Sequence, residues 1–197
     1  MEINSTKPSI ADPTSLGLLG LAMVTLIAAS QKLGWTQGYS FILPWAIFLG
    51  AFAQLMTSYA DSKRNNLFGS VVFGAYGLFW LGVASCWLIK MGVFGTILAE
   101  NMDVKQLGLA FLGYLVFSIA VTVAALKTNK VIFIILIFID FLFLGLSLAS
   151  FGIGATFWTG FAAYSELMIS ILSFYGSSAA LLNAQFNREI LPMGKFL

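Results

Sequence analysis

Six long hydrophobic runs, separated by short polar stretches, make up most of the chain. We place them at residues 16–33, 41–59, 69–89, 107–126, 131–153 and 158–183. Each run is close to the roughly 20 mostly apolar residues that a helix needs to cross a bilayer. The run from Val131 to Ile139 is apolar at every position, whereas a membrane β-strand alternates apolar with polar residues. The pattern therefore predicts an all-α integral membrane protein, built as a bundle of six transmembrane helices.

The composition indicates that lipid is the main solvent of this bundle. Of the 197 residues, 59% are hydrophobic and 9% are charged, and the mean hydropathy is +0.93. Soluble domains carry about 25% charged residues. We expect a transmembrane domain over residues 12–186, with tails at residues 1–11 and 187–197. The net charge of +2 is too small to indicate a nucleic-acid partner.

Lysines and arginines are distributed unequally between the two ends of the runs. The end that carries both chain termini holds Lys7, Lys63, Arg64, Lys127, Lys130, Arg188 and Lys195. The opposite end holds Lys32, Lys90 and Lys105. Since cytoplasmic loops carry the excess of positive residues, we expect a multi-pass protein with both tails in the cytoplasm.

The side chains that usually build catalytic or metal centres are scarce. The chain has no histidine, which removes the usual proton shuttle at neutral pH and the commonest metal ligand. Its one cysteine, Cys86, lies in an apolar run and cannot form a disulfide within the chain. The acids do not cluster at metal-ligand spacing. We therefore expect neither an enzyme nor a bound metal or cofactor.

Two acidic residues, Asp140 and Glu166, fall inside hydrophobic runs. A charged side chain at the centre of a bilayer costs roughly 2.5–3.5 kcal/mol on insertion scales, so such residues usually face the interior of a bundle and have a function. The sequence offers no basic residue at membrane depth to pair with either acid. Both are thus candidates for carrying a proton, although Glu166 can also lie near the end of its run, where water reaches it.

The polar residues of the sixth run share one helix face. Glu166, Ser170, Ser173 and Ser177 are spaced i, i+4, i+7 and i+11. We interpret this face either as the polar side of a solute pathway or as a seam between helices. Recurring glycines elsewhere allow the same two interpretations, since small residues let membrane helices pack closely.

Tyr76 and Trp80 lie deep in the third run, where their i, i+4 spacing places them on one helix face. Tyr76 is the candidate for a pore residue. It lies between Ala75 and Gly77, so its ring has room to project from the helix. A tyrosine in this position can narrow a pore and offer its hydroxyl group to a solute. Ordinary aromatic packing explains the same local pattern.

Four sequence blocks resemble the acetate uptake transporter family, which includes the bacterial succinate–acetate permeases. Residues 12–18 read D-P-T-S-L-G-L, where the family has N-P-A/V-P-L-G-L, and Leu21 stands at a family Phe position. Residues 61–69, 75–80 and 183–194 match three further family blocks in order and at fitting spacings. Asp12 and Ser15 depart from the first block. Asp12 can cap a helix N-terminus as Asn would, but it adds a negative charge beside a path for anions.

The resemblance implies a fold, an assembly and a set of pathway residues. Family members are six-helix membrane proteins that form homo-hexamers with a solute path inside each protomer, and for this chain we expect the plasma membrane of a prokaryote. They pass acetate and, in some members, succinate. The positions that correspond to the family constriction are Leu21, Tyr76 and Ile139. We expect substrate contacts near Leu18, Leu19, Gly20, Thr25, Asn66, Tyr76 and Ser173.

Two questions of mechanism stay open at this point. A dehydrated carboxylate is costly in an apolar neck, so the solute crosses either through a channel or together with a proton carried by Asp140 or Glu166. An alternative function is a channel for small neutral solutes or ammonia, because the runs hold no basic residue in their interior.

Overall fold

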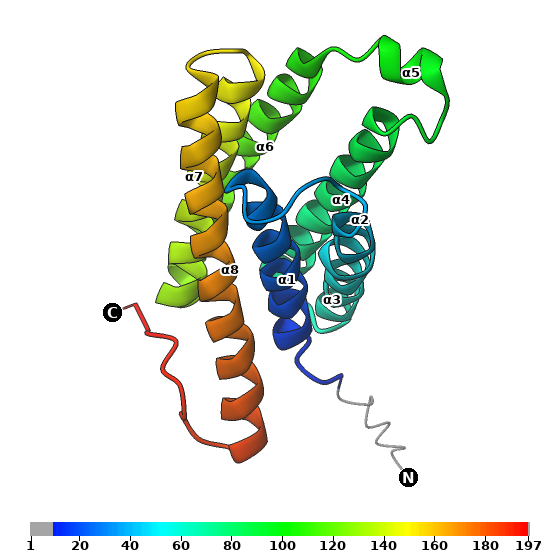
Figure 1. The fold of residues 1–197 in the computed structure, drawn as a ribbon. Coiled ribbons are helices and arrows are strands. Elements are labelled where there is room, and N and C mark those ends of the chain that lie inside the picture. The colour runs from blue at the N-terminus through cyan, green and yellow to red at the C-terminus, as the bar shows by residue number, and fades with distance from the viewer. Residues whose placement is uncertain (1–9, 197) are drawn as a thin grey trace.

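The computed structural model describes residues 10–196, and all of their regular secondary structure is helical (Figure 1). Residues 1–9 of the expected N-terminal tail, including Lys7, and Leu197 lie outside the described residues. Six helical segments are long and apolar enough to cross a membrane, which confirms the six-helix prediction. They span Thr14–Lys32, Ile42–Lys63, Leu67–Lys90, Val104–Lys127, Lys130–Ser150 and Ala155–Phe186. Every end lies within four residues of the end expected from the sequence.

Several of these spans are composite. Helix α1 is Thr14–Lys32, and the second span joins α2 (Ile42–Trp45), the π-helical η1 (Ala46–Ala53) and α3 (Gln54–Lys63). Helix α4 is Leu67–Lys90, and the loop after it contains the short α5 (Thr96–Glu100). The remaining elements are α6 (Val104–Ala124), the 3-10 turn η2 (Ala125–Lys127), α7 (Lys130–Ser150) and α8 (Ala155–Phe186).

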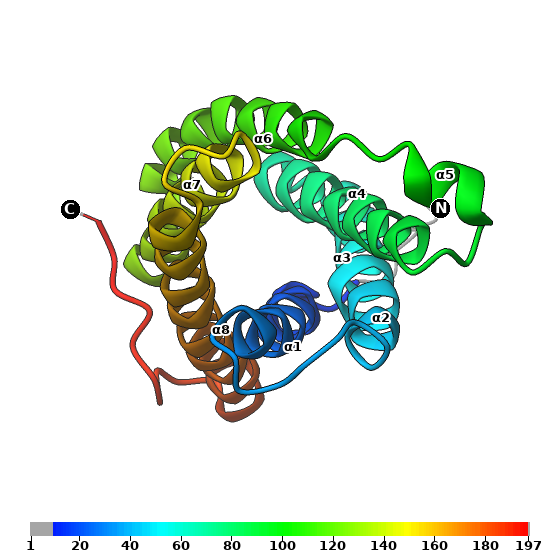
Figure 2. The same ribbon diagram turned by 45° about the horizontal axis from the view of Figure 1, so that its top comes forward.

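The six spans form a closed ring when viewed along the bundle (Figure 2). Helix α1 packs on α8, α8 on α7 and α7 on α6, while η1 and α3 lie between α1 and α4. Side chains complete the ring between α4 and α6. The Tyr76 hydroxyl lies 3.0 Å from Ser118 Oγ, and Tyr114 donates to the carbonyl of Ala75 at 3.1 Å.

Asn and Asp side chains cap the starts of three spans. Asn66 accepts a hydrogen bond from the Gly69 amide at α4, and Asn129 accepts one from the Ile132 amide at α7. Asp103 does the same for the start of α6. Each cap satisfies a backbone donor that the helix itself leaves free. The caps therefore fix where these three spans begin, one to three residues before the apolar runs from which they were predicted.

Glycines bring α1 and the second span into close contact. A side chain at Gly20 would collide with the backbone carbonyl of Leu49 in η1, and one at Gly77 would come within 3.1 Å of the carbonyl of Ala51. At these positions, the packing interpretation of the small residues is therefore the one that the structure supports. These close contacts fix the walls of the ring that η1 shares with α1 and with α4.

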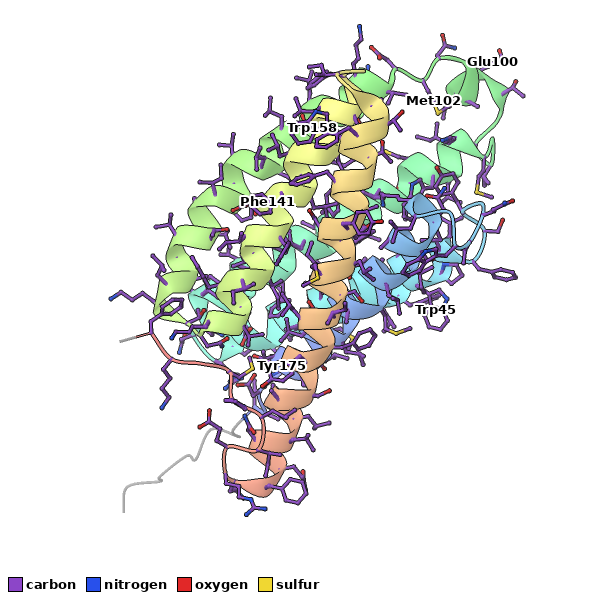
Figure 3. All side chains as sticks on the ribbon, turned by 60° about the vertical axis from the view of Figure 1, so that its left-hand side comes forward. Trp45, Glu100, Met102, Phe141, Trp158 and Tyr175 are labelled. Atoms are coloured by element: carbon purple, nitrogen blue, oxygen red, sulfur yellow. The ribbon has the colours of Figure 1, made fainter. Side chains whose placement is uncertain are left out.

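The lower ends of α7 and α8 in Figure 1 are held by the C-terminal segment. The side-chain oxygen of Asn183 accepts from the amides of Ile190 and Leu191, and the Tyr175 hydroxyl donates to the carbonyl of Pro192. Figure 3 shows Tyr175 on α8 beside this segment. The amide of Lys130 then donates to the carbonyl of Gly194 at 2.8 Å. Residues 187–196 thus pack against the bundle at the end where α1 begins.

Candidate functional site

Two cavities lie within the ring of helices. The first has a volume of about 200 Å³. We call it the lower cavity because residues at the starts of α1 and α4, the lower ends of these helices in Figure 1, line it. It opens beside the start of α1 and α4, and its lining includes Leu18, Leu21, Gln54, Asp61, Tyr76 and Ile139. Most of this lining is apolar. The second, the upper cavity, has a volume of about 360 Å³, and its lining includes Lys32, Tyr39, Phe79, Trp80, Leu142 and Glu166.

A narrow stretch, which we call the neck, separates the two cavities. Tyr76 lines the lower cavity, whereas Phe79, one turn further along α4, lines the upper cavity. On α7, Ile139 and Leu142 are divided between the cavities in the same way. One turn of helix rises about 5.4 Å. The two cavities therefore lie end to end along the axis of the ring, with a short apolar neck between them.

Aromatic rings pack around the neck. The ring of Phe143 lies 6.2 Å from that of Tyr76 and 5.1 Å from that of Phe79, measured between centroids. Phe79 also packs edge-on against Tyr114 at 5.0 Å. Rings at these separations and tilts attract each other beyond the area that they bury. The neck is thus a dense apolar structure and does not contain a wide channel.

The structure brings the three residues of the inferred constriction together. Leu21, Tyr76 and Ile139 come from α1, α4 and α7, they are at most 6% exposed, and all three line the lower cavity. Leu18 and Asn66, expected near the substrate, line the same cavity. The lower cavity therefore collects most of the pathway residues inferred from the sequence.

Four other expected contact residues lie elsewhere. Leu19 is 37% exposed, and both Leu19 and Gly20 are outside the lining of the two cavities. Thr25 is buried and donates to the carbonyls of Leu21 and Ala22 in its own helix. Ser173 is buried, and its hydroxyl has no hydrogen-bond partner among the described residues. A helix turns about 100° per residue, so consecutive residues such as Leu18, Leu19 and Gly20 do not share one wall.

Glu166 has a basic partner, which corrects the expectation that neither buried acid could be paired. Lys32 Nζ donates to Glu166 Oε2 at 2.7 Å, and Glu166 is 1% exposed. Lys32 is the last residue of α1, and the sequence placed it outside the membrane depth. Its long aliphatic stem lets the ammonium group extend from the helix end to α8. The expectation was wrong because it measured depth at the backbone and not at the charged atom.

Asp140 lies between α7 and α6, away from the lining of both cavities. Thr122 donates to one of its carboxylate oxygens at 2.8 Å, and the other oxygen has no partner within residues 10–196. The residue is adjacent to Ile139 in sequence, but it lies about 100° around the helix from it. Its side chain thus faces a helix contact.

The serines of the α8 polar face mostly form a seam with α1. Ser170 donates to the carbonyl of Ala22 at 2.8 Å, and Ser177 donates to the carbonyl of Ser15 at 2.7 Å. Of the two interpretations of this face, the helix seam therefore holds for both serines. Glu166 alone among the four lines a cavity.

Sequence reasoning did not select two polar residues that line the lower cavity, Gln54 and Asp61. Both are 0% exposed, and they are seven residues apart on α3, which places them on one helix face. Asp61 entered the sequence argument only as part of a family block. The missed signal was this i, i+7 spacing of polar side chains at the end of a hydrophobic run.

At the mouth of the lower cavity, Asp12 and Arg64 form an ion pair. Arg64 Nη1 lies 3.1 Å from Asp12 Oδ1, and the Thr14 amide donates to the same oxygen. Partial burial opposes ionisation of Asp12, but the hydrogen bonds from Arg64 and Thr14 outweigh it and hold its pKa below the usual range. Arg64 thereby offsets the negative charge that Asp12 adds beside the mouth. Among residues 10–196, no group of three His, Cys, Asp or Glu side chains is placed to hold a metal ion.

Comparison with known proteins agrees with this architecture. The model of the GPR1/FUN34/yaaH family matches residues 2–195 of the chain. The succinate-acetate/proton symporter SatP of Escherichia coli (strain K12) is 29% identical over 186 residues, which cover 94% of this chain and 96% of that protein. The ammonia transport outward protein 2 of Saccharomyces cerevisiae is 25% identical over 179 residues, which cover 89% of this chain and 63% of that protein.

A solved structure supports the fold independently of the sequence blocks. The structure described as the bacterial acetate channel SatP is similar with a TM-score of 0.87 and 27% sequence identity. The similarity covers 94% of this chain and 100% of that chain. The ring of six spans described above is therefore an arrangement already known from a membrane channel.

Proposed function

Because the chain belongs to the GPR1/FUN34/yaaH family, we propose that it carries acetate and related short-chain carboxylates, including succinate, across a membrane. It is a transport protein and not an enzyme. The observation that carries the proposal is the pair of cavities arranged end to end inside one ring of helices. The relatives whose names describe a succinate-acetate/proton symporter and an acetate channel support the substrate class.

The size and chemistry of the path fit a small carboxylate. Acetate has four non-hydrogen atoms, and a water molecule takes about 30 Å³ of liquid volume, so the lower cavity of about 200 Å³ can hold it. Leu18, Asn66 and Tyr76 are the proposed contacts there, with Thr25 and Ser173 as buried hydroxyls close to the α1 wall. Leu21, Tyr76 and Ile139 form the proposed constriction.

The apolar neck favours a substrate that crosses with a proton. Burying an unpaired carboxylate in an apolar environment is costly. Glu166 is one proposed proton carrier, since it lines the upper cavity beside Lys32. Asp140 is the weaker proposal, because Thr122 holds it at a helix contact.

The direct test is counterflow of labelled acetate into proteoliposomes. We expect saturable counterflow, competition by succinate and no competition by urea. The Tyr76→Ala variant should raise the flux or broaden the accepted substrate size, because it removes a ring from the constriction. A signal equal to that of protein-free liposomes would contradict the proposal.

Ammonia is the second candidate substrate, and a specific observation favours it. The yeast relative is named as an ammonia transport protein, and the lower cavity contains unpartnered acceptor oxygens that suit N–H donors. Ammonia added as a competitor in the counterflow experiment separates the two functions. Strong competition by ammonia, together with weak competition by succinate, would favour this second candidate.

The assembly and the orientation are also proposals. We propose a homo-hexamer in the plasma membrane of a prokaryote, with both tails in the cytoplasm and the apolar outer faces of the spans against lipid or other copies. Exposed Phe48, Phe52, Val116 and Phe157 are examples of those outer faces. Native mass spectrometry from detergent tests the assembly, and protease protection of a C-terminal tag in inside-out vesicles tests the orientation.

A further inference from the structure

The lower cavity contains two hydrogen-bond acceptors without partners. Gln54 Oε1 and Asp61 Oδ2 are buried and belong to side chains that line this cavity, and neither oxygen accepts a hydrogen bond from any of residues 10–196. A buried acceptor that has lost water and found no replacement costs about 1–3 kcal/mol, and more if it is charged. Two such oxygens on one wall indicate that a ligand normally supplies the missing donors.

The surroundings of Gln54 determine which end of its amide is free. Its Nε2 donates to the carbonyl of Gly50 at 2.7 Å, within the π-helical stretch before α3. Turning the amide over would bring its oxygen against that carbonyl, and two acceptors would then face each other. The free end is therefore the oxygen. Gln54 lines the cavity together with Tyr76. Its neighbour Leu55 lies against Gly77, the residue after Tyr76, so Gln54 lies at the level of the neck.

The surroundings of Asp61 likewise leave one oxygen free. Asn66 donates to its Oδ1 at 3.1 Å, and Arg64 Nη1 lies 3.8 Å from the same atom. Oδ2 occupies the space that a side chain at Gly69 would fill. The charged groups that act on this carboxyl are Arg64, on the same helix, and Asp12, before α1. Neither supplies a hydrogen bond to Oδ2.

The chemistry of the free atoms selects the ligand. A carboxylate anion has acceptor oxygens only and cannot satisfy another acceptor, whereas a carboxylic acid has an O–H group. A single bound cation does not explain both atoms, because residues seven apart in a helix are separated by about 10.5 Å along its axis. A small molecule that carries its own donor, and moves from one oxygen to the other, fits both.

We propose that the lower cavity binds its substrate as the neutral carboxylic acid, that Asp61 supplies the proton, and that Gln54 accepts the hydrogen bond of the acid at the neck. This proposal rests on the proposed carboxylate transport. Protonated Asp61 gives its proton to an oxygen of acetate, so that the O–H bond of Asp61 breaks and an O–H bond of acetic acid forms. Solution at the lower mouth then returns a proton to the Asp61 carboxylate.

The pH profile of transport tests the role of Asp61. Initial rates of labelled acetate uptake are measured in proteoliposomes over a series of pH values, with protein-free liposomes subtracted. For Asp61→Asn, we expect the rate to fall about tenfold for each unit of pH above the pKa of acetic acid, because only acid formed in solution can enter. The wild type should fall less steeply. Glu100→Gln, an exposed change on α5, is the matched control and should follow the wild type.

A second variant tests Gln54. Gln54→Met keeps the length of the side chain but has no carbonyl oxygen. We expect uptake to fall by about tenfold at every pH, which corresponds to one lost hydrogen bond to a strongly polar group, while the steepness of the profile stays that of the wild type. This second result can be read even if Asp61→Asn does not fold.

The possible outcomes separate the two proposals. Wild-type uptake equal to that of protein-free liposomes would contradict carboxylate transport itself. Active wild type with an unchanged profile in Asp61→Asn would overturn only the proton role of Asp61. Unchanged uptake in Gln54→Met would overturn the acceptor role at the neck. Wild-type uptake that follows an imposed membrane potential would show that the anion crosses, and would overturn the neutral-acid proposal.

Discussion

The two cavities differ in how closely their buried carboxylate is paired with a basic side chain. In the upper cavity, Glu166 is paired with Lys32 at 2.7 Å. In the lower cavity, Asp61 has a guanidinium no nearer than 3.8 Å, and one of its oxygens has no partner. The charge of the buried carboxylate is therefore neutralised by a lysine in the upper cavity, whereas the carboxylate of the lower cavity has one oxygen without a hydrogen bond.

This difference indicates which of the two carboxylates can form a new hydrogen bond during transport. Breaking a buried, close ion pair costs several kcal/mol, so the Lys32–Glu166 pair holds α1 to α8 in one arrangement. A carboxyl with a free oxygen can form a new hydrogen bond without breaking an existing one. The new hydrogen bond that our proposal requires therefore costs less to form in the lower cavity than in the upper cavity.

The largest expected effect comes from removing the compensation in the upper cavity. Lys32→Met leaves Glu166 buried without its partner, and we expect the free energy of unfolding in detergent to fall by about 3 kcal/mol. Thermal and denaturant unfolding measure it. The double variant Lys32→Met/Glu166→Gln should regain most of the loss, because the stranded charge is gone.

A surface lysine provides the control for this experiment. Lys90 lies over the Tyr39 ring at 5.1 Å and is exposed. Lys90→Met should cost less than about 1 kcal/mol. Equal losses for the Lys32 and Lys90 variants would show that Glu166 does not depend on its partner, and the contrast between the cavities would disappear.

The second largest effect is expected in the lower cavity, at the glycine that contacts Asp61. Gly69→Ala places a methyl group where the Asp61 carboxylate lies, and we expect the free energy of unfolding to fall by about 2 kcal/mol. We also expect acetate uptake by this variant to fall with pH as steeply as in Asp61→Asn. Gly82 lies in the same helix with nothing within 4 Å of its added side chain. Gly82→Ala should instead stabilise the helix by about 0.5–1 kcal/mol. A stable, fully active Gly69→Ala protein would argue against the crowded position of Asp61.

A smaller effect is expected at the neck between the cavities. Tyr76→Phe removes the hydrogen bond of 3.0 Å to Ser118 and keeps the ring. We expect a loss of about 1 kcal/mol in unfolding free energy with little change in acetate flux. A strong loss of flux in Tyr76→Phe would mean that the hydroxyl contacts the substrate, and the neck would then be more than an apolar barrier.

The smallest effect concerns the ion pair at the lower mouth. The pKa of Asp12 is lower in the folded protein than its ordinary value of 3.8. Its stabilisation is therefore present above that value and is lost as the pH falls through the folded pKa. Since Asp12 is 54% exposed, we expect about 0.5 kcal/mol or less. Asp12→Asn should lower the melting temperature slightly at neutral pH and not in strong acid; a difference that persists in acid would contradict the assignment.

Much of the fold could be predicted from the sequence, but less of the site could. The spans were located within four residues because the length of an apolar run is a local property of the sequence. Tyr76 was selected because its flanking small residues are visible in the sequence. Gln54 was missed because its place on one cavity lining with Leu21 and Ile139 arises only through packing.

Three properties follow from the residues alone. Composition indicates that lipid surrounds the helices, the length of the apolar runs gives the number of spans, and the order of the motifs gives the family. Which polar groups are paired, in contrast, follows only from the tertiary structure. Lys32 and Glu166 are 134 residues apart in the chain, and nothing local signals their contact. The free oxygens of Gln54 and Asp61 are likewise defined by what surrounds them. Burial and hydrogen bonding are properties of neighbours in space, and folding the six spans into a ring chooses those neighbours.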